Sequence, residues 1–324
     1  MLACCGAEEC SVSSTGLEQD MSTRTQPGGT FPLGDRQVAR IGYGAGRLDQ
    51  HAADPSAGVA VLHAARALGV DHVDTAQFYG DGVANDIIRR AFGDSADVAI
   101  VSKVGAERVD APVPITPAQR PAQLRAQVED NLRTLGRERL DVVNLRRLDT
   151  GPGLRAQGDQ VVDIEDQLAE LAALRDAGVI GAIGLSGIDL STLRRSLPVG
   201  IACVQNAFSV LSRDDEELFA ACRDEGIAWV PFWPLGGSLP PGVGNAITRF
   251  PPVRDDETVR AIAAELNATP AQVGLAWLLG HGPNVLVIPG TASVDHLAQN
   301  IEVGALELTA EHTRRLDDVW SAKA

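Results

Sequence analysis

Three residues in the first third of the chain have the side chains needed to donate a proton to a carbonyl oxygen. The stretch DTAQFYGDG contains Asp74 and Tyr79, and Lys103 lies in the apolar run VAIVSKV. A phenol, whose ordinary pKa is about 10, donates its proton efficiently only where its anion is stabilised. A lysine ammonium can stabilise that anion, and an aspartate can hold the lysine in place and keep it protonated. We therefore expect Asp74, Tyr79 and Lys103 to form an acid–base set.

Each of these residues also has a structural interpretation that involves no chemistry. Asp74, followed by Thr75, can cap a turn, Tyr79 can cover the rim of a domain, and Lys103 can pair with any nearby acid. The decision between the two interpretations depends on whether the fold brings the three side chains together.

The elements that must position these residues alternate between short β-rich runs and amphipathic helical runs from about Thr30 onward. The strands are continuous apolar runs, which is typical of parallel strands buried on both faces. Eight such βα units favour a (β/α)8 TIM barrel over an open doubly wound sheet, and no G-x-G-x-x-G sequence supports a Rossmann domain. The expected strands are Val38–Gly44, Asp71–Ala76, Val98–Val104, Leu140–Leu145, Ala182–Gly187, Ala202–Ala207, Ile227–Leu235 and Val285–Gly290.

Two additions to the barrel are expected. The segment TFPLGDRQVAR before the first strand predicts a hairpin at the N-terminal end of the barrel, and Ala310–Trp320 predicts an extra C-terminal helix. We expect residues 1–29 to be a disordered extension and residues 30–324 to be one domain.

The ends of the predicted strands indicate where chemistry would occur. In a TIM barrel the active site lies at the carboxyl ends of the strands. Asp74, Lys103, Arg146, Ser186 and Gln205 all fall at such ends, on separate strands. The convergence of these five residues supports an active site at this end more strongly than any one of them does alone.

Composition excludes several classes of partner. A formal net charge of −15 argues against binding to nucleic acid or to an anionic membrane surface, and no run of apolar residues is long enough to span a bilayer. Five cysteines, of which Cys4, Cys5 and Cys10 cluster near the N-terminus, make a poor disulfide framework and lack the further ligands of a metal site. We expect a cytoplasmic protein without a metal centre.

Six motifs follow one another along the chain: DTAQFYG (Asp74–Gly80), VSKV (Val101–Val104), IGLSG (Ile183–Gly187), VQN (Val204–Asn206), WVPFWPLG (Trp229–Gly236) and VIPGTASVDHLAQN (Val287–Asn300). Together they make the sequence resemble the aldo-keto reductase family from about Gly42 to the C-terminal helix.

The resemblance implies hydride transfer between a nicotinamide cofactor and a carbonyl carbon, with Tyr79 as the proton donor. NADPH is the expected cofactor, with NADH possible, and the expected partner is a small carbonyl compound. By the same resemblance Ser186 and Gln205 would bind the carboxamide, Phe232 would stack on the ring, and Gly290, Thr291 and Ser293 would lie near the 2′-phosphate. The other cofactor-binding candidates in these motifs are Leu235, His296, Gln299 and Asn300.

The sequence departs from the family pattern in three places. Arg146 stands where a catalytic histidine is usual, and it can either donate to the substrate oxygen or pair with Asp149 or another acid at the rim. Arginine does not deprotonate, so Arg146 could orient and polarise but not shuttle a proton. Phe232 replaces a stacking tyrosine, and Gly290 and His296 stand where many members carry lysine and arginine, which weakens the case for selection of NADPH over NADH.

Two other functions remain open at this point. Some barrels of this family serve as redox-sensing regulatory subunits with little turnover, although the presence of Asp74, Tyr79 and Lys103 favours catalysis. A reductase confined to one pathway, acting on a sugar or polyketide ketone, is a further alternative.

Overall fold

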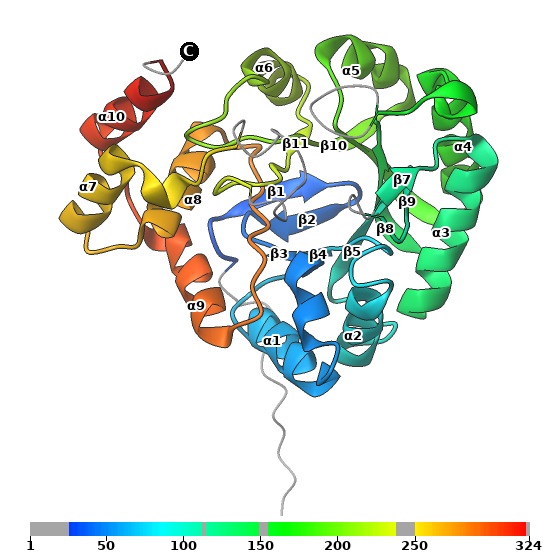
Figure 1. The fold of residues 1–324 in the computed structure, drawn as a ribbon, viewed down its shortest axis with the longest axis horizontal. Helices are drawn as coiled ribbons and strands as arrows, with labels where there is room; N and C mark the ends of the chain where they lie inside the picture. The colour runs from blue at the N-terminus through cyan, green and yellow to red at the C-terminus, as the bar shows by residue number, and fades with distance from the viewer. Residues whose placement is uncertain (1–25, 112–114, 149–154, 238–249, 322–324) are drawn as a thin grey trace, which may run out of the picture.

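Seven parallel strands form the wall of a barrel, and helices surround it (Figure 1). The computed structural model describes residues 26–111, 115–148, 155–237 and 250–321. In spatial order the strands are β3 (Tyr43–Gly44), β4 (His72–Asp74), β5 (Ala99–Val104), β8 (Leu140–Arg146), β9 (Ile180–Ser186), β10 (Ile201–Gln205) and β11 (Ala228–Trp229). The predicted TIM barrel is confirmed.

The eighth predicted strand closes the barrel through single bridges. Val285 pairs in parallel with Trp229 of β11, and Val287 pairs in parallel with Ile41, just before β3. The segment thus touches both edges of the sheet, although it is too irregular to form a continuous ladder.

The predicted strand Val38–Gly44 is divided in two. Its first part belongs to a hairpin and its last two residues form β3. The division falls at Arg40, whose guanidinium donates to the carbonyl oxygens of Val285 (3.1 Å), Leu279 (2.6 Å) and Gly282 (2.6 Å). These bonds turn the chain from the hairpin into the barrel wall, a tertiary effect that the apolar pattern of the segment does not encode.

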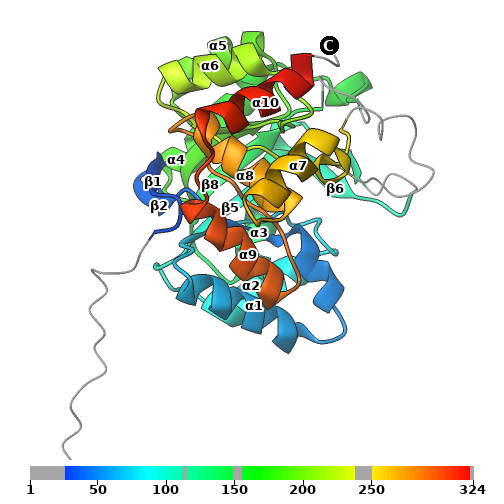
Figure 2. The same cartoon turned by 90° about the vertical axis from the view of Figure 1, so that its left-hand side faces the viewer.

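The predicted N-terminal hairpin is present and closes one end of the barrel. Strands β1 (Thr30–Leu33) and β2 (Arg36–Ala39) pair antiparallel, with Thr30 opposite Ala39. Leu33 and Val38 pack against apolar side chains of the barrel strands, including Val101 and Val142. Figure 2 shows this hairpin at the end opposite the short strand β6 (Ala106–Arg108), which pairs with β7 (Ile115–Pro117).

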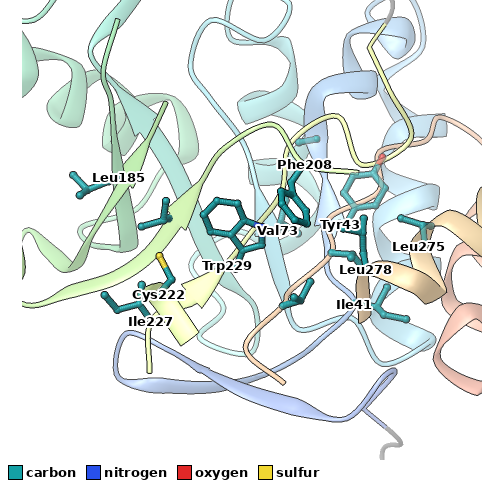
Figure 3. Close-up of a cluster of buried hydrophobic side chains, with 14 of the residues drawn as sticks. Ile41, Tyr43, Val73, Leu185, Phe208, Cys222, Ile227, Trp229, Leu275 and Leu278 are labelled. Carbon is teal, nitrogen blue, oxygen red and sulfur yellow. The ribbon is translucent and has the colours of Figure 1, made fainter. Parts of the chain in front are cut away.

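The helices cover the outside of the barrel, and their buried faces share one core with the strands. Figure 3 shows part of this core, where Trp229 and Phe208 lie in edge contact with ring centroids 5.6 Å apart. The last helix is the predicted C-terminal one. The helices are α1 (Pro55–Ala67), α2 (Val83–Phe92), α3 (Pro121–Leu135), α4 (Ile164–Asp176), α5 (Leu190–Ser196), α6 (Glu216–Asp224), α7 (Glu257–Glu265), α8 (Pro270–His281), α9 (Val294–Glu302) and α10 (Ala310–Ser321).

Most of the predicted N-terminal extension, including Cys4, Cys5 and Cys10, lies outside the described residues. Its described end is attached to the barrel, because Gln26 donates to the Asp71 carboxylate (2.9 Å) and Pro27 accepts from the Ile41 amide (3.2 Å). Among the described helices, none has the length and apolar character needed to cross a membrane.

Candidate active site

A buried ion pair joins the ends of two neighbouring strands. Asp74 ends β4 and Lys103 lies in β5, and both side chains are buried. The Lys103 ammonium contacts the Asp74 Oδ1 atom and also donates to the Thr75 carbonyl oxygen (3.0 Å). Gln205, at the end of β10, donates to the other carboxylate oxygen at 2.7 Å. Asp74 is therefore fixed from two sides, and Lys103 is held in one position.

Tyr79 lies over this pair. It follows β4 in a tight turn, where its amide donates to the Ala76 carbonyl oxygen (3.0 Å) and the next residue, Gly80, has a positive φ of 59°. The Lys103 Nζ atom is 5.3 Å from the centroid of the Tyr79 ring. Burial alone would lower the pKa of Lys103, but the charges of Asp74 and Tyr79 outweigh it and raise that pKa. Lys103 is thus a permanent cation beneath the phenol.

The Thr75 side chain has a different task from the turn cap considered above. Its hydroxyl donates to the Asn85 side-chain oxygen at 2.9 Å, in a buried contact that ties the end of β4 to α2. The sequence did not indicate this anchor, because the two residues belong to different elements.

Arg146 ends β8 on the other side of β5 and faces the same group. It is half-buried, and its Cζ atom lies 5.9 Å from the centroid of the Phe78 ring, which in turn meets the Tyr79 ring edge-on at 5.2 Å. Burial lowers the pKa of Arg146, whereas the charge of Tyr79 acts to raise it. The guanidinium forms no ion pair with any described residue, and Asp149, its alternative partner, lies outside the described residues.

Gln119 connects the two strands that carry Lys103 and Arg146, a contact that no sequence pattern predicts. Its buried side-chain amide donates to the carbonyl oxygens of Gly105 (2.5 Å) and Arg146 (2.8 Å). Gln167 of α4 donates in turn to the Gln119 side-chain oxygen at 3.0 Å. No motif marks the residue, since its partners are backbone atoms far away in the sequence.

The candidates for nicotinamide binding border this group. Ser186 ends β9 beside Arg146 in the strand register, and Gln205 ends β10. Gln205 Oε1 is buried and accepts no hydrogen bond from any described residue. A buried acceptor without a donor is costly, so this atom is suited to a bound ligand that carries an N–H group, as a carboxamide does.

Phe232 and Leu235 follow β11 on the next part of the rim. Phe232 bridges to Ala207, and its ring meets Trp233 edge-on at 5.6 Å. Phe232 is half-buried, so part of its ring is free to contact a ligand, whereas Leu235 packs against the core.

The segment before α9 is held by backbone contacts. The Tyr43 hydroxyl donates to the Thr291 carbonyl oxygen (2.5 Å), and a ring nitrogen of His51 lies 3.1 Å from the Ala292 carbonyl oxygen. Thr291 Oγ1 accepts from the Ser293 amide, and Ser293 Oγ accepts from the His296 amide at the start of α9. His296 and Gln299 are exposed and Asn300 is half-buried. No described hydrogen bond or ion pair joins these residues to Asp74, Lys103 or Arg146.

Comparisons with known proteins agree with this architecture. The family model for the Aldo/keto reductase family matches residues 40–321. The chain is 41% identical over 302 residues to pyridoxine 4-dehydrogenase of Escherichia coli (strain K12), covering 90% of this chain and 98% of that protein. It is 30% identical over 298 residues to the uncharacterized oxidoreductase C215.11c of Schizosaccharomyces pombe, covering 90% and 89%.

A solved structure has the same fold and a bound cofactor. The aldo-keto reductase from Klebsiella pneumoniae in complex with NADPH superimposes with a TM-score of 0.72 at 25% sequence identity, covering 90% of this chain and 95% of that one.

The chain belongs to the aldo/keto reductase family. It is an NAD(P)H-dependent oxidoreductase that reduces an aldehyde or ketone to an alcohol, and the fold, the family match and the relatives do not favour the regulatory-subunit alternative.

Proposed function

We propose that this enzyme uses NADPH to interconvert an aromatic aldehyde of the pyridoxal type and its alcohol, with Tyr79 donating the proton. The observation that carries the chemistry is the buried Asp74–Lys103 ion pair beneath the Tyr79 ring. The observation that favours the substrate is the 41% identity, over nearly the whole length of both chains, to a pyridoxine 4-dehydrogenase.

Lys103 and Asp74 act on the phenol. The fixed ammonium lowers the cost of forming the Tyr79 phenolate, so the phenol can give its proton to the carbonyl oxygen as negative charge develops there. Asp74 keeps Lys103 charged and in place, and Gln205 holds the second oxygen of Asp74. In the direction of alcohol oxidation the same phenolate would accept the proton.

Arg146 acts on the oxygen of the substrate. Its guanidinium is the second cation near Tyr79 and is free of ion pairs within the described part of the chain. A pyridoxal-type aldehyde carries a hydroxyl group on the ring carbon next to the one that bears the carbonyl group, and a guanidinium fork can donate to two neighbouring oxygens at once. We assign Arg146 to both the developing alkoxide and this hydroxyl oxygen.

The cofactor would be held by residues at the ends of β9, β10 and β11 and by the segment before and within α9. NADPH supplies the hydride when it is bound. Ser186 and the unpartnered Gln205 Oε1 fit the carboxamide, Phe232 and Leu235 line the neighbouring rim, and the segment that includes Gly290, Thr291, Ser293, His296, Gln299 and Asn300 fits the adenosine phosphate. The unpartnered Gln205 Oε1 supports this assignment, although Gly290 and His296 stand where many members of the family carry lysine and arginine.

Side-by-side assays of three aldehydes test the proposal. With NADPH in excess, pyridoxal and 2-hydroxybenzaldehyde should be reduced with a higher kcat/KM than benzaldehyde, which lacks the neighbouring oxygen. In the Arg146→Ala variant this preference should disappear. Turnover of benzaldehyde equal to that of pyridoxal in the unmodified enzyme would remove the substrate assignment and leave a general carbonyl reductase.

A further inference from the structure

Gly290 stands where many members of the family carry a lysine, and the backbone around it leaves no room for a side chain. A Cβ atom at Gly290 would lie 2.8 Å from the Gly44 carbonyl oxygen, and one at Gly44 would lie 2.5 Å from the Ile288 carbonyl oxygen. The end of β3 and the segment before α9 therefore meet backbone to backbone. A lysine at Gly290 would push these two segments apart.

The same close approach brings another cation to Gly290. The chain leaves β3 directly into the 3-10 helix η2 (Ala45–His51), which carries the exposed residue Arg47. The Cγ atom of Arg47 lies 3.8 Å from the Cβ position of Gly290, so the stem of the side chain crosses the glycine. Tyr43 and His51, at the two ends of this stretch, bond to the carbonyl oxygens of Thr291 and Ala292 and fix η2 against the segment.

The Arg47 guanidinium is uncommitted within the described part of the chain, where it forms no hydrogen bond or ion pair. Asp49 on η2 and Asp295 in the first turn of α9 are both exposed, and neither is paired with Arg47. In a protein of net charge −15, an anionic ligand needs such a local cation to offset the general repulsion.

We propose that Arg47 binds a phosphate group of the dinucleotide cofactor and supplies the positive charge that Gly290 lacks. The inference rests on the proposed cofactor site. A Cβ atom at Gly46, the neighbour of Arg47, would lie 3.7 Å from the Cζ atom of Tyr79. The helix η2 therefore extends from the catalytic group to the α9 segment. Arg47 thus lies on the stretch that joins the catalytic group to the segment proposed to hold the adenosine phosphate.

Binding measurements with Arg47→Ala test this proposal without any turnover. The Kd for NADPH, measured by quenching of protein fluorescence, should rise roughly tenfold to a hundredfold, as expected for loss of a charge-assisted hydrogen bond. Arg47→Lys should recover part of the affinity. The matched control is Arg194→Ala, which removes an exposed arginine from α5, on the far side of the barrel from α9 (Figure 1).

Two further ligands, NADH and 2′,5′-ADP, identify which phosphate group of the cofactor Arg47 binds. A loss confined to NADPH and 2′,5′-ADP, with NADH unchanged, assigns Arg47 to the 2′-phosphate, whereas an equal loss for NADPH and NADH assigns it to the pyrophosphate. An Arg47→Ala Kd equal to that of Arg194→Ala for every ligand would overturn the proposal. Failure of the unmodified protein to bind NADPH would instead contradict the proposed function itself.

Discussion

The catalytic group and the segment before α9 are built from different kinds of contact. At the ends of β4, β5 and β10, buried polar and charged side chains are bonded to one another, as Asp74, Lys103 and Gln205 are. Before α9, backbone carbonyl oxygens and hydroxyl groups make most of the contacts, while the side chains of Asp295 and His296 are exposed. The structure of the catalytic group depends on which residues carry charge, whereas the structure of the segment before α9 depends on the path of the backbone.

This difference predicts how the two regions respond to substitution. A buried charge without its partner is costly, so Lys103 and Asp74 depend on each other. An exposed cation can bind an anionic ligand from any nearby position that reaches it. In our proposal Arg47 therefore replaces the lysine that many members carry at the position of Gly290, as long as the backbone shape is kept. We expect substitutions in the catalytic group to affect turnover and folding, and substitutions of side chains near α9 to affect affinity alone.

The largest effect is expected for Tyr79→Phe. Loss of the hydroxyl removes proton donation, so kcat should fall by roughly 10²–10⁴, the usual contribution of general acid catalysis. The Kd for NADPH should change little, because the ring remains. Parallel measurements of kcat and of the Kd for NADPH check this prediction, and near-normal turnover would exclude Tyr79 from the mechanism.

Lys103→Met should be nearly as severe, with folding affected as well. It leaves the Asp74 carboxylate buried with only Gln205 as a partner, which should lower the free energy of unfolding by about 3–5 kcal/mol. Urea denaturation measures the loss. The double variant Asp74→Leu with Lys103→Met should lose less stability than Lys103→Met alone, and a larger loss would show that the pair is not coupled in this way.

The same ion pair has a defined pH dependence. The pKa of Lys103 is raised in the folded protein, so its contribution to stability is fully present below the unfolded pKa of about 10.4 and is lost as the pH rises through the higher folded value. The difference in stability between the unmodified protein and Lys103→Met should therefore be constant near neutral pH and shrink only above about pH 10.4.

Arg146→Ala should reduce turnover without weakening the cofactor complex. Removal of a preorganised donor to a developing oxyanion typically lowers kcat by roughly 10²–10³. Arg146→His should retain part of the activity, because an imidazole offers a donor at a similar place with shorter reach. If Arg146→Ala keeps full turnover but unfolds at a lower temperature, Arg146 is a structural residue and the catalytic set is Asp74, Tyr79 and Lys103.

Gly290→Ala should have the smallest effect of these substitutions, and it tests the role of the backbone in the segment before α9. The added methyl group has to displace the Gly44 carbonyl oxygen, which should cost about 1–3 kcal/mol of folding stability. Gly280→Ala in α8 is the control, since open space surrounds that position and an alanine within a helix should not destabilise the fold. A melting temperature of Gly290→Ala no lower than that of the unmodified protein would show that the backbone contact at Gly290 is unimportant.

The sequence predicted the barrel because apolar strands and helices alternate strictly, and it predicted the hairpin from TFPLGDRQVAR. It did not separate β2 from β3, since the break at Arg40 depends on carbonyl oxygens near residue 280. Asp74, Lys103 and Arg146 were predicted together because strand ends meet at one rim, and Tyr79 was predicted from its acid–base chemistry; the structure brings the four side chains into one group. Gln119 and Arg47 were missed, because one acts on backbone atoms and the other is defined only by its contact with Gly290.

Transfer of labelled hydride tests the central claim most directly. NADPH that carries deuterium at both positions of the reactive carbon of the nicotinamide ring is supplied with pyridoxal, and the alcohol product is analysed by mass spectrometry for the unmodified enzyme and for Tyr79→Phe. Direct hydride transfer with Tyr79 as the acid predicts one deuterium at the former carbonyl carbon and almost no product from the variant. Unlabelled alcohol, or equal amounts of product from both proteins, would contradict the account.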